Sequence, residues 1–525
     1  MIKRLALLFL AIPALAFGDA SIRHPYLVAT KAPLRQLRSL IDASDRVTAE
    51  FDIVDGFAAD LTDDEVARLR RSSSVRYVTP DAECHILEVD SDISLPLPAA
   101  AGQSIPYGIK QVHADLVWPY ATGAKIRVGI IDTGIDYLHP DLVGRFRGGY
   151  DFYNHDDDPM DDNGHGTHVA GTVAANNNEI GVVGVAPGVD LYALKVLNSA
   201  GSGSAGQLIA ALDWAVANKL NVLNMSLGFG TSSPPLLEEA FRRVREAGIL
   251  PIAAAGNDGT DGISYPAAYP GVIAVGAVGE DSHLASFSNR GPQLLVVAPG
   301  IDVYSSLPST IPTAGAIRRS DGVGVPASPL TYSPVSDFEG PFVSSGLGYP
   351  ADFTGSVIGK IALIRRGELT FGEKAQNAMR AGAKAVVIYN NVPGPFNGTL
   401  GGVDRWPLTV GISMDDGLAL INNSSLRMTV STSAEGYGKL SGTSMSTPHV
   451  TGVAALVWSL KPTVPADSVR AALSGGAHDL GDTGFDLSFG FGLIDAYAAG
   501  NLLVPGRFSQ PPAPQPVPRS HGVRH

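Results

Sequence analysis

Short runs of almost uninterrupted apolar residues recur along the chain, and this feature constrains the fold more than any other. They occupy residues 126–131, 190–196, 222–225, 249–254 and 272–278. A strand that is apolar on both faces belongs in a parallel sheet with helices on both sides. Between the runs, apolar residues recur at helical spacing, for example over residues 207–219 and 236–247, and this pattern predicts those helices. We therefore expect an α/β fold built on a doubly wound parallel sheet.

Composition narrows the class of protein. The chain has 525 residues, of which 45% are apolar and 17% charged, so it can bury more than one core. Its formal charge of −13 argues against a basic surface for nucleic acid, and no nucleic-acid partner is expected. Cys84 is the single cysteine, so no intramolecular disulfide can form.

The N-terminus has the pattern of a secretion signal. Lys3 and Arg4 precede an apolar run over residues 5–17, and small residues follow at 18–20. The run is too short to span a bilayer, which favours a cleaved signal over an anchor, and a buried helix is the weaker alternative. We expect residues 1–20 to be a signal peptide of a secreted protein that has no membrane anchor.

Residues 25–89 form a separate unit in this interpretation. Strand patterns cover residues 26–29, 51–54 and 75–78, and Thr62 with Glu65 predicts a capped helix start. Residues 90–102 contain prolines and a run of alanines, which is typical of a cleavable linker. A small domain, a linker and a larger body are the parts of a zymogen.

The regular pattern breaks again between residues 308 and 434. This stretch is rich in Pro, Ser and Gly before a strand at 359–364, a helix at 372–381 and a strand at 385–389. We expect an inserted domain, because the pattern of the larger body resumes only afterwards. Residues 504–525 are Pro-rich and are expected to form a tail without regular structure.

Three motifs carry the chemistry. They contain Asp132 at the end of an apolar run, His165 in a Gly-flanked stretch, and Ser444 ahead of a helical pattern at 450–460. A carboxylate, an imidazole and a hydroxyl in that order are what acyl transfer by a serine nucleophile requires. The N-terminus of a helix also directs peptide N–H groups toward such a hydroxyl.

Each residue also has a simpler interpretation. Ser444 could cap a helix, and His168, three residues after His165, fits a buried core histidine. Asn257 follows an apolar run and can donate to an oxyanion without carrying charge, although a turn asparagine is the simpler reading. A zinc pair at His165 and His168 is disfavoured, because no carboxylate or cysteine nearby completes a ligand set.

Together, the segments 132–136, 165–172 and 442–449 resemble the three signatures of the subtilisin-like serine proteases. The resemblance implies a subtilisin-like catalytic domain over residues 103–307 and 435–503. It implies Ser444 as nucleophile, His165 as general base and then acid, and Asp132 as the residue that orients the histidine. Asn257 and the Ser444 backbone N–H would form the oxyanion hole. The expected activity is that of a secreted serine endopeptidase acting through an acyl-enzyme.

The resemblance also implies where a peptide substrate binds. Two strands would pair with an extended peptide, one on each side. One strand comprises Ser226, Leu227 and Gly228, and the other comprises Gly201, Ser202 and Gly203. Gly256 and Ser264 would line a P1 pocket for medium or large apolar side chains. Ala205 stands where the family often has a bulkier residue, which predicts an open P4 site.

A structural calcium ion is the cofactor that the resemblance implies. Its ligands would be Gln103, Asp141, Asn176, Asn178, Ile180 and Val182, which offer side-chain and carbonyl oxygens. A polar loop without an ion is the alternative. Bound calcium would stabilise a secreted protein that lacks disulfides.

The flanking domains carry resemblances as well. Residues 25–89 resemble an α+β inhibitory propeptide, which acts as an intramolecular inhibitor and would be removed by cleavage between about 90 and 103. Residues 308–434 resemble a mainly β protease-associated (PA) domain, on the segments 359–366, 372–382 and 385–391. The mature enzyme is expected to be a monomer that acts on proteins and peptides.

Two other functions use the same scaffold. A catalytically silent protein could bind peptides or glycans through the inserted domain, and an esterase or peptide ligase could use the same catalytic residues. Labelling with phenylmethylsulfonyl fluoride followed by digestion of a protein substrate separates the three functions.

Overall fold

The computed structural model describes residues 22–31, 37, 40–41, 46–87, 102–396, 398–401, 405–423 and 425–508. The described residues up to Asp81 form one compact unit, and those from Ala82 form a second. The signal peptide expected at 1–20 lies outside the described residues, as do most of the linker at 90–102 and most of the tail at 504–525.

The first unit is a four-stranded antiparallel sheet with one helix packed on it. The strand order is β2 (Val47–Phe51), β3 (Gly56–Leu61), β1 (His24–Thr30) and β4 (Val75–Pro80), and the helix is α1 (Asp63–Arg71). The predicted capping box is present, because Thr62 accepts from the Glu65 N–H and Glu65 accepts from the Thr62 N–H. Val28, Phe57 and Leu69 lie in the core between sheet and helix.

The strand predicted at residues 51–54 is wrong. Strand β2 ends at Phe51, which pairs with Gly56, and the residues between them form a tight reversal. Asp52 and Asp55 flank two apolar residues in this reversal, and the Asp55 carbonyl accepts from the Thr30 N–H at 2.8 Å. Aspartates favour turns, and here that preference outweighs the strand propensity of the two apolar residues.

The second unit contains the predicted doubly wound parallel sheet. Its seven strands, in spatial order, are β14 (Leu294–Pro299), β13 (Ile273–Val278), β12 (Leu250–Ala254), β10 (Val222–Met225), β6 (Arg127–Asp132), β8 (Asp190–Lys195) and β7 (Phe146–Asp151). All neighbouring pairs are parallel. The apolar runs in the sequence correspond to the inner five strands, and the two edge strands were not predicted.

Strand β6 is the switch point of this sheet. The chain adds β7 and β8 on one side of β6 and then crosses to add β10, β12, β13 and β14 on the other. The loops that leave the carboxyl ends of strands diverge at such a point, which leaves room for a ligand. Asp132 is the last residue of β6, so it lies at this position.

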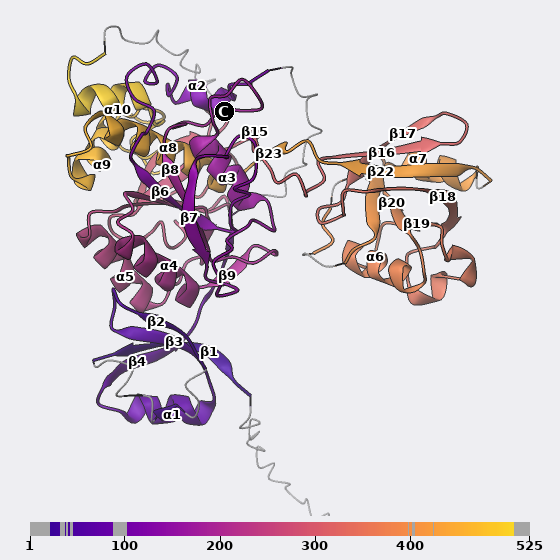
Figure 1. The fold of residues 1–525 in the computed structure, drawn as a ribbon, viewed down its shortest axis with the longest axis horizontal. Helices are drawn as coiled ribbons and strands as arrows, with labels where there is room; N and C mark the ends of the chain where they lie inside the picture. The colour runs from indigo at the N-terminus through magenta and orange to yellow at the C-terminus, as the bar shows by residue number, and fades with distance from the viewer. Residues whose placement is uncertain are drawn as a thin grey trace, which may run out of the picture. The chain divides into compact units, whose positions relative to one another are not determined.

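Helices cover both faces of the sheet (Figure 1). Val128 and Ile130 of β6 share one core with Val169 of α3 (His165–Ala174) and Val453 of α8 (Thr443–Leu460). The alternate residues of the strand are buried too, so a second helical layer is required. The helices α4 (Ala205–Ala217) and α5 (Pro235–Glu246), which pack on each other and on the sheet, provide it.

Smaller elements complete this unit. The helices are α2 (Tyr107–Gln111), α9 (Ala466–Gly475) and α10 (Ala496–Leu503). A three-stranded antiparallel sheet places β5 (Glu83–Ile86) between β9 (Ser202–Ser204) and β11 (Leu227–Gly228). An antiparallel pair, β15 (Val303–Ser306) and β23 (Tyr437–Leu440), brackets the inserted segment.

The inserted segment forms a closed barrel, so the expected β-rich domain is present. Its strands, in spatial order, are β16 (Ala314–Arg319), β17 (Gly324–Pro329), β21 (Leu408–Ile412), β20 (Ala385–Tyr389), β19 (Ile361–Arg365), β18 (Asp337–Ser344) and β22 (Arg427–Ser433). The helices α6 (Phe371–Arg380) and α7 (Met414–Ile421) and the short 3₁₀ turns η4 (Pro350–Asp352) and η5 (Gly355–Val357) join them. Three barrel strands come from the Pro-rich lead-in, where the sequence predicted no regular structure.

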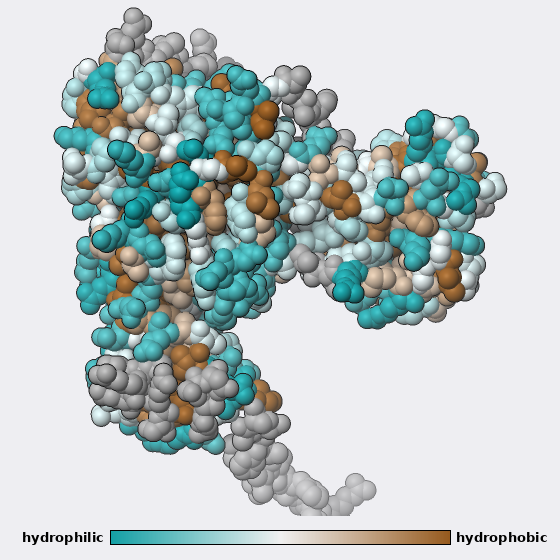
Figure 2. All heavy atoms as spheres, in the orientation of Figure 1, coloured by the Kyte–Doolittle hydropathy of each residue, from teal (hydrophilic) through white to brown (hydrophobic). Residues whose placement is uncertain are grey.

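Most large apolar side chains of the described residues are buried in these cores. On the face drawn in Figure 2, the exposed hydrophobic side chains occur in small groups among hydrophilic ones. Within the described part of the chain, no helix combines the length and the apolar character that crossing a bilayer requires.

Candidate active site

Asp132 and His165 form a buried hydrogen-bonded pair. The His165 Nδ1 lies 2.7 Å from the Asp132 Oδ1, and both side chains are essentially inaccessible to solvent. The same carboxylate oxygen accepts from the Thr133 N–H at 2.8 Å. The carboxylate therefore fixes which ring nitrogen of His165 carries a proton and leaves Nε2 as the basic atom.

His165 is the first residue of α3. Gly164 caps the helix with a φ of 105°, a left-handed conformation that glycine adopts at little cost. The Gly166 N–H donates to the Thr133 hydroxyl at 2.9 Å. The first turn of the helix is therefore bonded directly to the residue that follows Asp132.

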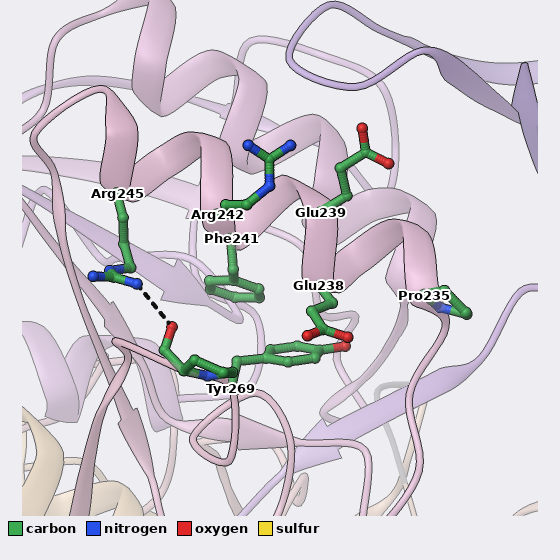
Figure 3. A pocket seen from close by; sticks show the side chains of 8 residues that line it. Pro235, Glu238, Glu239, Phe241, Arg242, Arg245 and Tyr269 are labelled. Atoms are coloured by element: carbon green, nitrogen blue, oxygen red, sulfur yellow. Dashed lines mark hydrogen bonds between the residues drawn. The ribbon is translucent and has the colours of Figure 1, made fainter. Parts of the chain in front are cut away.

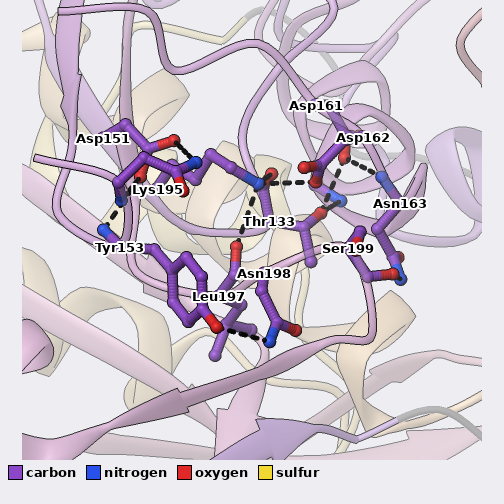
Figure 4. A network of polar contacts seen from close by, with 12 residues as sticks. Thr133, Asp151, Tyr153, Asp161, Asp162, Asn163, Lys195, Leu197, Asn198 and Ser199 are labelled. Carbon is purple, nitrogen blue, oxygen red and sulfur yellow. Dashed lines mark hydrogen bonds and ion pairs between the residues drawn. The ribbon is translucent and has the colours of Figure 1, made fainter. Parts of the chain in front are cut away.

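Asp161 joins the strand end and the helix start more firmly (Figure 4). One of its oxygens accepts from the Thr133 hydroxyl at 2.9 Å and from the N–H groups of Asn163 and Gly164. The other accepts from the Thr167 N–H at 2.8 Å and the Thr167 hydroxyl at 2.6 Å. One buried carboxylate thus holds the loop, the strand end and the first turn of α3 in register.

Lys195 supports the same region from the neighbouring strand. Its ammonium group is buried and donates to the Thr133 carbonyl at 2.6 Å, the Asp162 carboxylate at 2.6 Å and the Leu197 carbonyl at 3.0 Å (Figure 4). All three N–H bonds of the ammonium are satisfied, which a buried charge needs. Burial raises the pKa of the Asp162 carboxyl, and the Lys195 charge opposes that rise.

Ser444 is the second residue of α8, so this helix begins earlier than the pattern at 450–460 had suggested. Its hydroxyl donates to the Ser226 carbonyl at 3.0 Å. Pro448 lies four residues later and has no N–H to bond the Ser444 carbonyl. The Ser226 hydroxyl takes that place at 2.8 Å, which ties the start of the helix to the end of β10.

Asn257 presents its amide N–H₂ beside this helix start. Its side-chain oxygen accepts from the Thr443 N–H at 2.9 Å and the Thr443 hydroxyl at 2.7 Å, so the orientation of the amide is fixed. The amide nitrogen donates to the carbonyl oxygen of Leu87 at 2.6 Å. An uncharged, oriented donor on a peptide carbonyl is the arrangement that an oxyanion hole requires.

Leu87 directly follows strand β5, which lies between two other strands. Strand β5 pairs antiparallel with β9 and β11, which contain four of the six residues expected to bind a peptide, while Gly201 and Ser226 directly precede these strands. The Ile86 N–H donates to the Gly201 carbonyl at 2.9 Å, and the Leu87 N–H to the Ser226 carbonyl at 3.4 Å. The segment 83–87 therefore occupies this site as an extended peptide would.

The Leu87 side chain lies against Gly228, where an added Cβ would come within 2.9 Å of a leucine methyl. Gly256 has a φ of 114°, and a Cβ there would come within 2.6 Å of the Ser264 hydroxyl. Neither position has room for a larger side chain, because Leu87 occupies the space at Gly228 and Asn289 and Ser264 occupy it at Gly256. Ala205, at the start of α4, is fully buried.

The expected calcium ligands come together around Gln103. The Gln103 amide nitrogen lies 2.7 Å from the Asn176 carbonyl, 3.3 Å from the Asn178 side-chain oxygen, 3.4 Å from the Ile180 carbonyl and 3.3 Å from the Val182 carbonyl. Asp141 is fully buried, and its carboxylate accepts from Asn178 and from the Val182 N–H. Oxygens that converge on one partially positive group make a donor set that suits calcium.

This donor set contains one carboxylate. Among the described residues, no group of three or more His, Cys, Asp or Glu side chains could hold a metal ion. Zinc and iron usually require such groups, whereas calcium also binds carbonyl and amide oxygens. The residues present therefore fit calcium better than a transition metal.

Two further histidines are buried and uncharged. The His168 Nε2 lies 2.9 Å from the Val303 carbonyl and 3.2 Å from the Gly438 carbonyl, which links α3 to β15 and β23. Burial lowers the pKa of His168 to about 3, and burial lowers that of His449 to about 4. These contacts fit the core role that the sequence suggested for His168.

A separate pocket of about 450 Å³ lies on α5 (Figure 3). Glu238, Phe241 and Tyr269 line it, and Arg245 donates to the Pro270 carbonyl at its edge at 3.2 Å. None of its lining residues belongs to the Asp132, His165 and Ser444 set. The pocket is therefore distinct from the site described above.

Sequence reasoning missed the residues that hold this site together. Asp161 directly precedes the histidine motif, and its position in a run of polar residues was an available signal. Lys195 lies inside the apolar run at 190–196, where a lysine is unusual and could have been noticed. No sequence signal connects distant Tyr332 to the site, although its hydroxyl contacts the loop of His165 through Asn163.

Comparison with protein-family models assigns three regions. A model described as the subtilase family matches residues 123–321 and 382–492. A PA domain model matches residues 330–420, and a peptidase inhibitor I9 model matches residues 24–87.

Similar proteins agree with these assignments. Subtilisin E of Bacillus subtilis is 40% identical over 307 residues, which cover 56% of this chain and 76% of the relative. Subtilisin DY of Bacillus licheniformis is 50% identical over 217 residues, covering 40% and 78%. A crystal structure of a psychrophilic subtilisin-like protease from Antarctic Pseudoalteromonas sp. AS-11 aligns with a TM-score of 0.51 and 32% identity over 76% of this chain and 97% of that one. The chain belongs to the subtilase family of serine proteases.

Proposed function

We propose that this protein is a secreted, self-processing endopeptidase that cleaves peptide bonds through Ser444, His165 and Asp132. The observation that carries the proposal is the contact between the Asn257 amide nitrogen and the Leu87 carbonyl at 2.6 Å. That carbonyl belongs to an extended segment paired on both sides, next to the start of the helix that carries Ser444.

In the proposed reaction, the Ser444 oxygen attacks the carbonyl carbon of the peptide while His165 Nε2 takes its proton. Asp132 keeps the imidazole oriented through Nδ1 and stabilises its charged form without taking the proton. Asn257 donates to the oxygen as negative charge develops on it. His165 then protonates the leaving amine, and a water molecule activated by the same nitrogen hydrolyses the acyl-enzyme.

The segment 83–87 also suggests which peptides fit. Leu87 would be the P1 residue, because its carbonyl contacts Asn257, and Ile86 would be the P2 residue. The Leu87 side chain against Gly228 supports a preference for apolar P1 residues. A cleavage profile dominated by Lys or Arg at P1 would contradict this preference.

The same contact suggests where self-processing begins. We expect the first cut after Leu87, which is slightly earlier than the range of 90 to 103 that the sequence suggested. The segment before the cut matches the peptidase inhibitor model, so residues 25–87 are proposed as the inhibitory propeptide, which is two residues shorter than the 25–89 that the sequence suggested. The catalytic domain is proposed to span 103–307 and 435–503, interrupted by the PA-like insert at 308–434.

Calcium is proposed as a structural cofactor of the mature enzyme. The six residues around Gln103 would hold the ion by side-chain and carbonyl oxygens, and the ion would supply stability to the folded state. Secretion is proposed from the signal-like N-terminus, where a charged start precedes a short apolar run.

Replacing Ser444 with Ala tests the proposal. The triad acts as a unit, and in subtilisin itself such a loss costs on the order of a million-fold in turnover. The variant should therefore leave a precursor-sized protein, whereas the parent should yield a mature form whose propeptide fragment ends at Leu87. A Ser446→Ala variant serves as control, because Ser446 is a buried serine two residues along the same helix. Processing of the Ser444→Ala precursor at the parent rate would contradict the proposal.

A further inference from the structure

A tyrosine of the inserted domain contacts the active-site loop. The Tyr332 hydroxyl accepts from the Asn163 side-chain N–H₂ at 2.8 Å and donates to the Ser199 carbonyl at 2.6 Å. The ring of Tyr332 packs against the apolar core of the insert that contains Leu330 and Phe396. The side chain is thus anchored in one domain while its hydroxyl bonds the other.

Asn163 connects this hydroxyl to the catalytic histidine. Its side-chain oxygen accepts from the His165 N–H at 3.1 Å, and its nitrogen donates to the Ser199 carbonyl at 2.9 Å as well as to Tyr332. One amide therefore joins the first residue of α3, the Ser199 turn and the insert. A second contact lies nearby, because a Cβ on Gly164 would come within 2.5 Å of the Ile311 side chain.

The Ser199 turn leads directly into the strand that pairs with a peptide. The Gly201 N–H donates to the Asn198 carbonyl at 2.9 Å, and the Asn198 N–H to the Ser202 carbonyl at 2.9 Å. On the peptide side, the Gly201 carbonyl accepts from the Ile86 N–H, and the Gly201 α-carbon lies against the Ile86 side chain. The position of this turn therefore sets how the residue before P1 is held.

Tyr332 also has a constrained backbone. Its φ is 72°, in the left-handed region that side chains other than those of Gly and Asn seldom adopt. Such a conformation persists only when surrounding contacts hold it, and it often marks a functional position. Hydrogen bonds on both sides support this backbone, because the Thr331 N–H donates to the Gly398 carbonyl and the Ser333 N–H donates to the Leu330 carbonyl.

We propose that Tyr332 of the inserted domain is a positioning residue for substrate binding, which fixes the P2 side of the peptide-binding strand relative to the catalytic histidine. This inference rests on the proposed peptidase function. It gives the insert a direct part in selecting extended peptides. The Tyr332 hydroxyl bonds the Ser199 turn, which leads into the peptide-binding strand, and it does not contact the reacting atoms. A substrate without a P2 residue does not use the turn and should be indifferent to the hydroxyl.

The test compares Tyr332→Phe with the parent on two substrates. The first is Ala-Ala-Ile-Leu-p-nitroanilide, which fills P4 to P1, and the second is N-acetyl-leucine p-nitrophenyl ester, which fills P1 alone. Loss of the two hydrogen bonds that the hydroxyl makes, with Asn163 and with Ser199, should raise KM for the tetrapeptide by about three- to tenfold. The kcat for that substrate should stay within about twofold, and the ester kinetics should not change.

Tyr349→Phe is the matched control, because the Tyr349 hydroxyl bonds Glu368 within the insert at 2.5 Å. It should match the parent on both substrates. Equal kinetics of Tyr332→Phe and the parent on the tetrapeptide would overturn the inference, as would equal losses on both substrates. The melting temperatures of both Phe variants, measured in a Ser444→Ala background, show whether an equal loss on both substrates follows from destabilisation of the fold. Destabilisation by Tyr332→Phe would also overturn the inference. If the parent hydrolyses neither substrate, the peptidase proposal itself fails.

Discussion

Replacing Asp161 with Asn tests how much the hydrogen bonds of the Asp161 carboxylate contribute to holding Asp132 and His165 in place. The substitution keeps the shape of the side chain but replaces one oxygen with an N–H₂ group. Three donors bond one carboxylate oxygen, so the amide oxygen should keep that position. The N–H₂ group would then face the Thr167 N–H and hydroxyl, which lie 2.8 and 2.6 Å from the other oxygen.

The cost follows from these two lost hydrogen bonds. A hydrogen bond to a charged group contributes about 1.5–3 kcal/mol, and a buried donor left without an acceptor costs a similar amount. We therefore expect Asp161→Asn to lower the free energy of unfolding by about 3–6 kcal/mol. In an active background the turnover number should fall as well, because the first turn of α3 carries His165.

Urea unfolding of the Ser444→Ala precursor, which cannot digest itself, provides the assay. Asp158→Asn is the control on the same loop, because Asp158 is exposed and an amide oxygen can still accept from the Tyr137 hydroxyl. The control should unfold at the parent midpoint. A loss below about 1 kcal/mol for Asp161→Asn would refute the reasoning, because it would mean that the carboxylate bonds are not needed.

Three further predictions concern the metal, the buried histidines and the oxyanion donor. Excess chelator should lower the melting temperature of the mature enzyme, and calcium at about 100 times its dissociation constant should restore about 2.7 kcal/mol; unchanged melting would count against the site. His168 and His449 are held neutral below their usual pKa of 6.5, so the unfolded state binds more protons as the pH falls. The stability that these neutral histidines contribute should be fully present above pH 6.5, and the free energy of unfolding should decline by up to about 2.7 kcal/mol per pH unit between pH 6 and 4. Urea titrations at several pH values measure this decline. A flat profile would exclude the two histidines as its cause. Asn257→Ala should reduce kcat by about 100- to 1000-fold with little change in KM, and a smaller loss in steady-state assays would remove it from the oxyanion hole.

The inner strands could be predicted because both of their faces are buried. Strand β10 coincides with the apolar run at 222–225, and β6, β8, β12 and β13 differ from their runs by about one residue at an end. The edge strand β7 has the sequence Phe-Arg-Gly-Gly-Tyr-Asp and is only partly buried, so its pattern carries no such signal. Strand β14 is fully buried and apolar, and it could have been found by the same rule.

The Pro-rich lead-in shows the limit of local patterns. Strand β17 contains two prolines and is half exposed, yet it pairs with β16 and β21 in the closed barrel. Pairing with distant strands supplies the order that the local sequence lacks. The same reason explains the start of α8, where a tertiary contact with Ser226 extends the helix beyond its local pattern at 450–460.

The sequence drew attention to the residues of the candidate site but not to their supports. Motif order suggested roles for Asp132, His165 and Ser444, and the family resemblance suggested one for Asn257; these catalytic roles stay predictions. Contacts between residues far apart in the chain, such as Tyr332 with Ser199, leave no local trace. They become visible only when the fold brings the two segments together.

Mass spectrometry after labelling with phenylmethylsulfonyl fluoride tests the central claim most directly. We predict one sulfonyl adduct on the peptide that contains Ser444, formed in parallel with the loss of proteolysis and absent from a His165→Ala variant, since the unactivated hydroxyl is a poor nucleophile. Full proteolysis by a protein that carries no adduct on Ser444, or an inactivating adduct on another serine, would contradict the account.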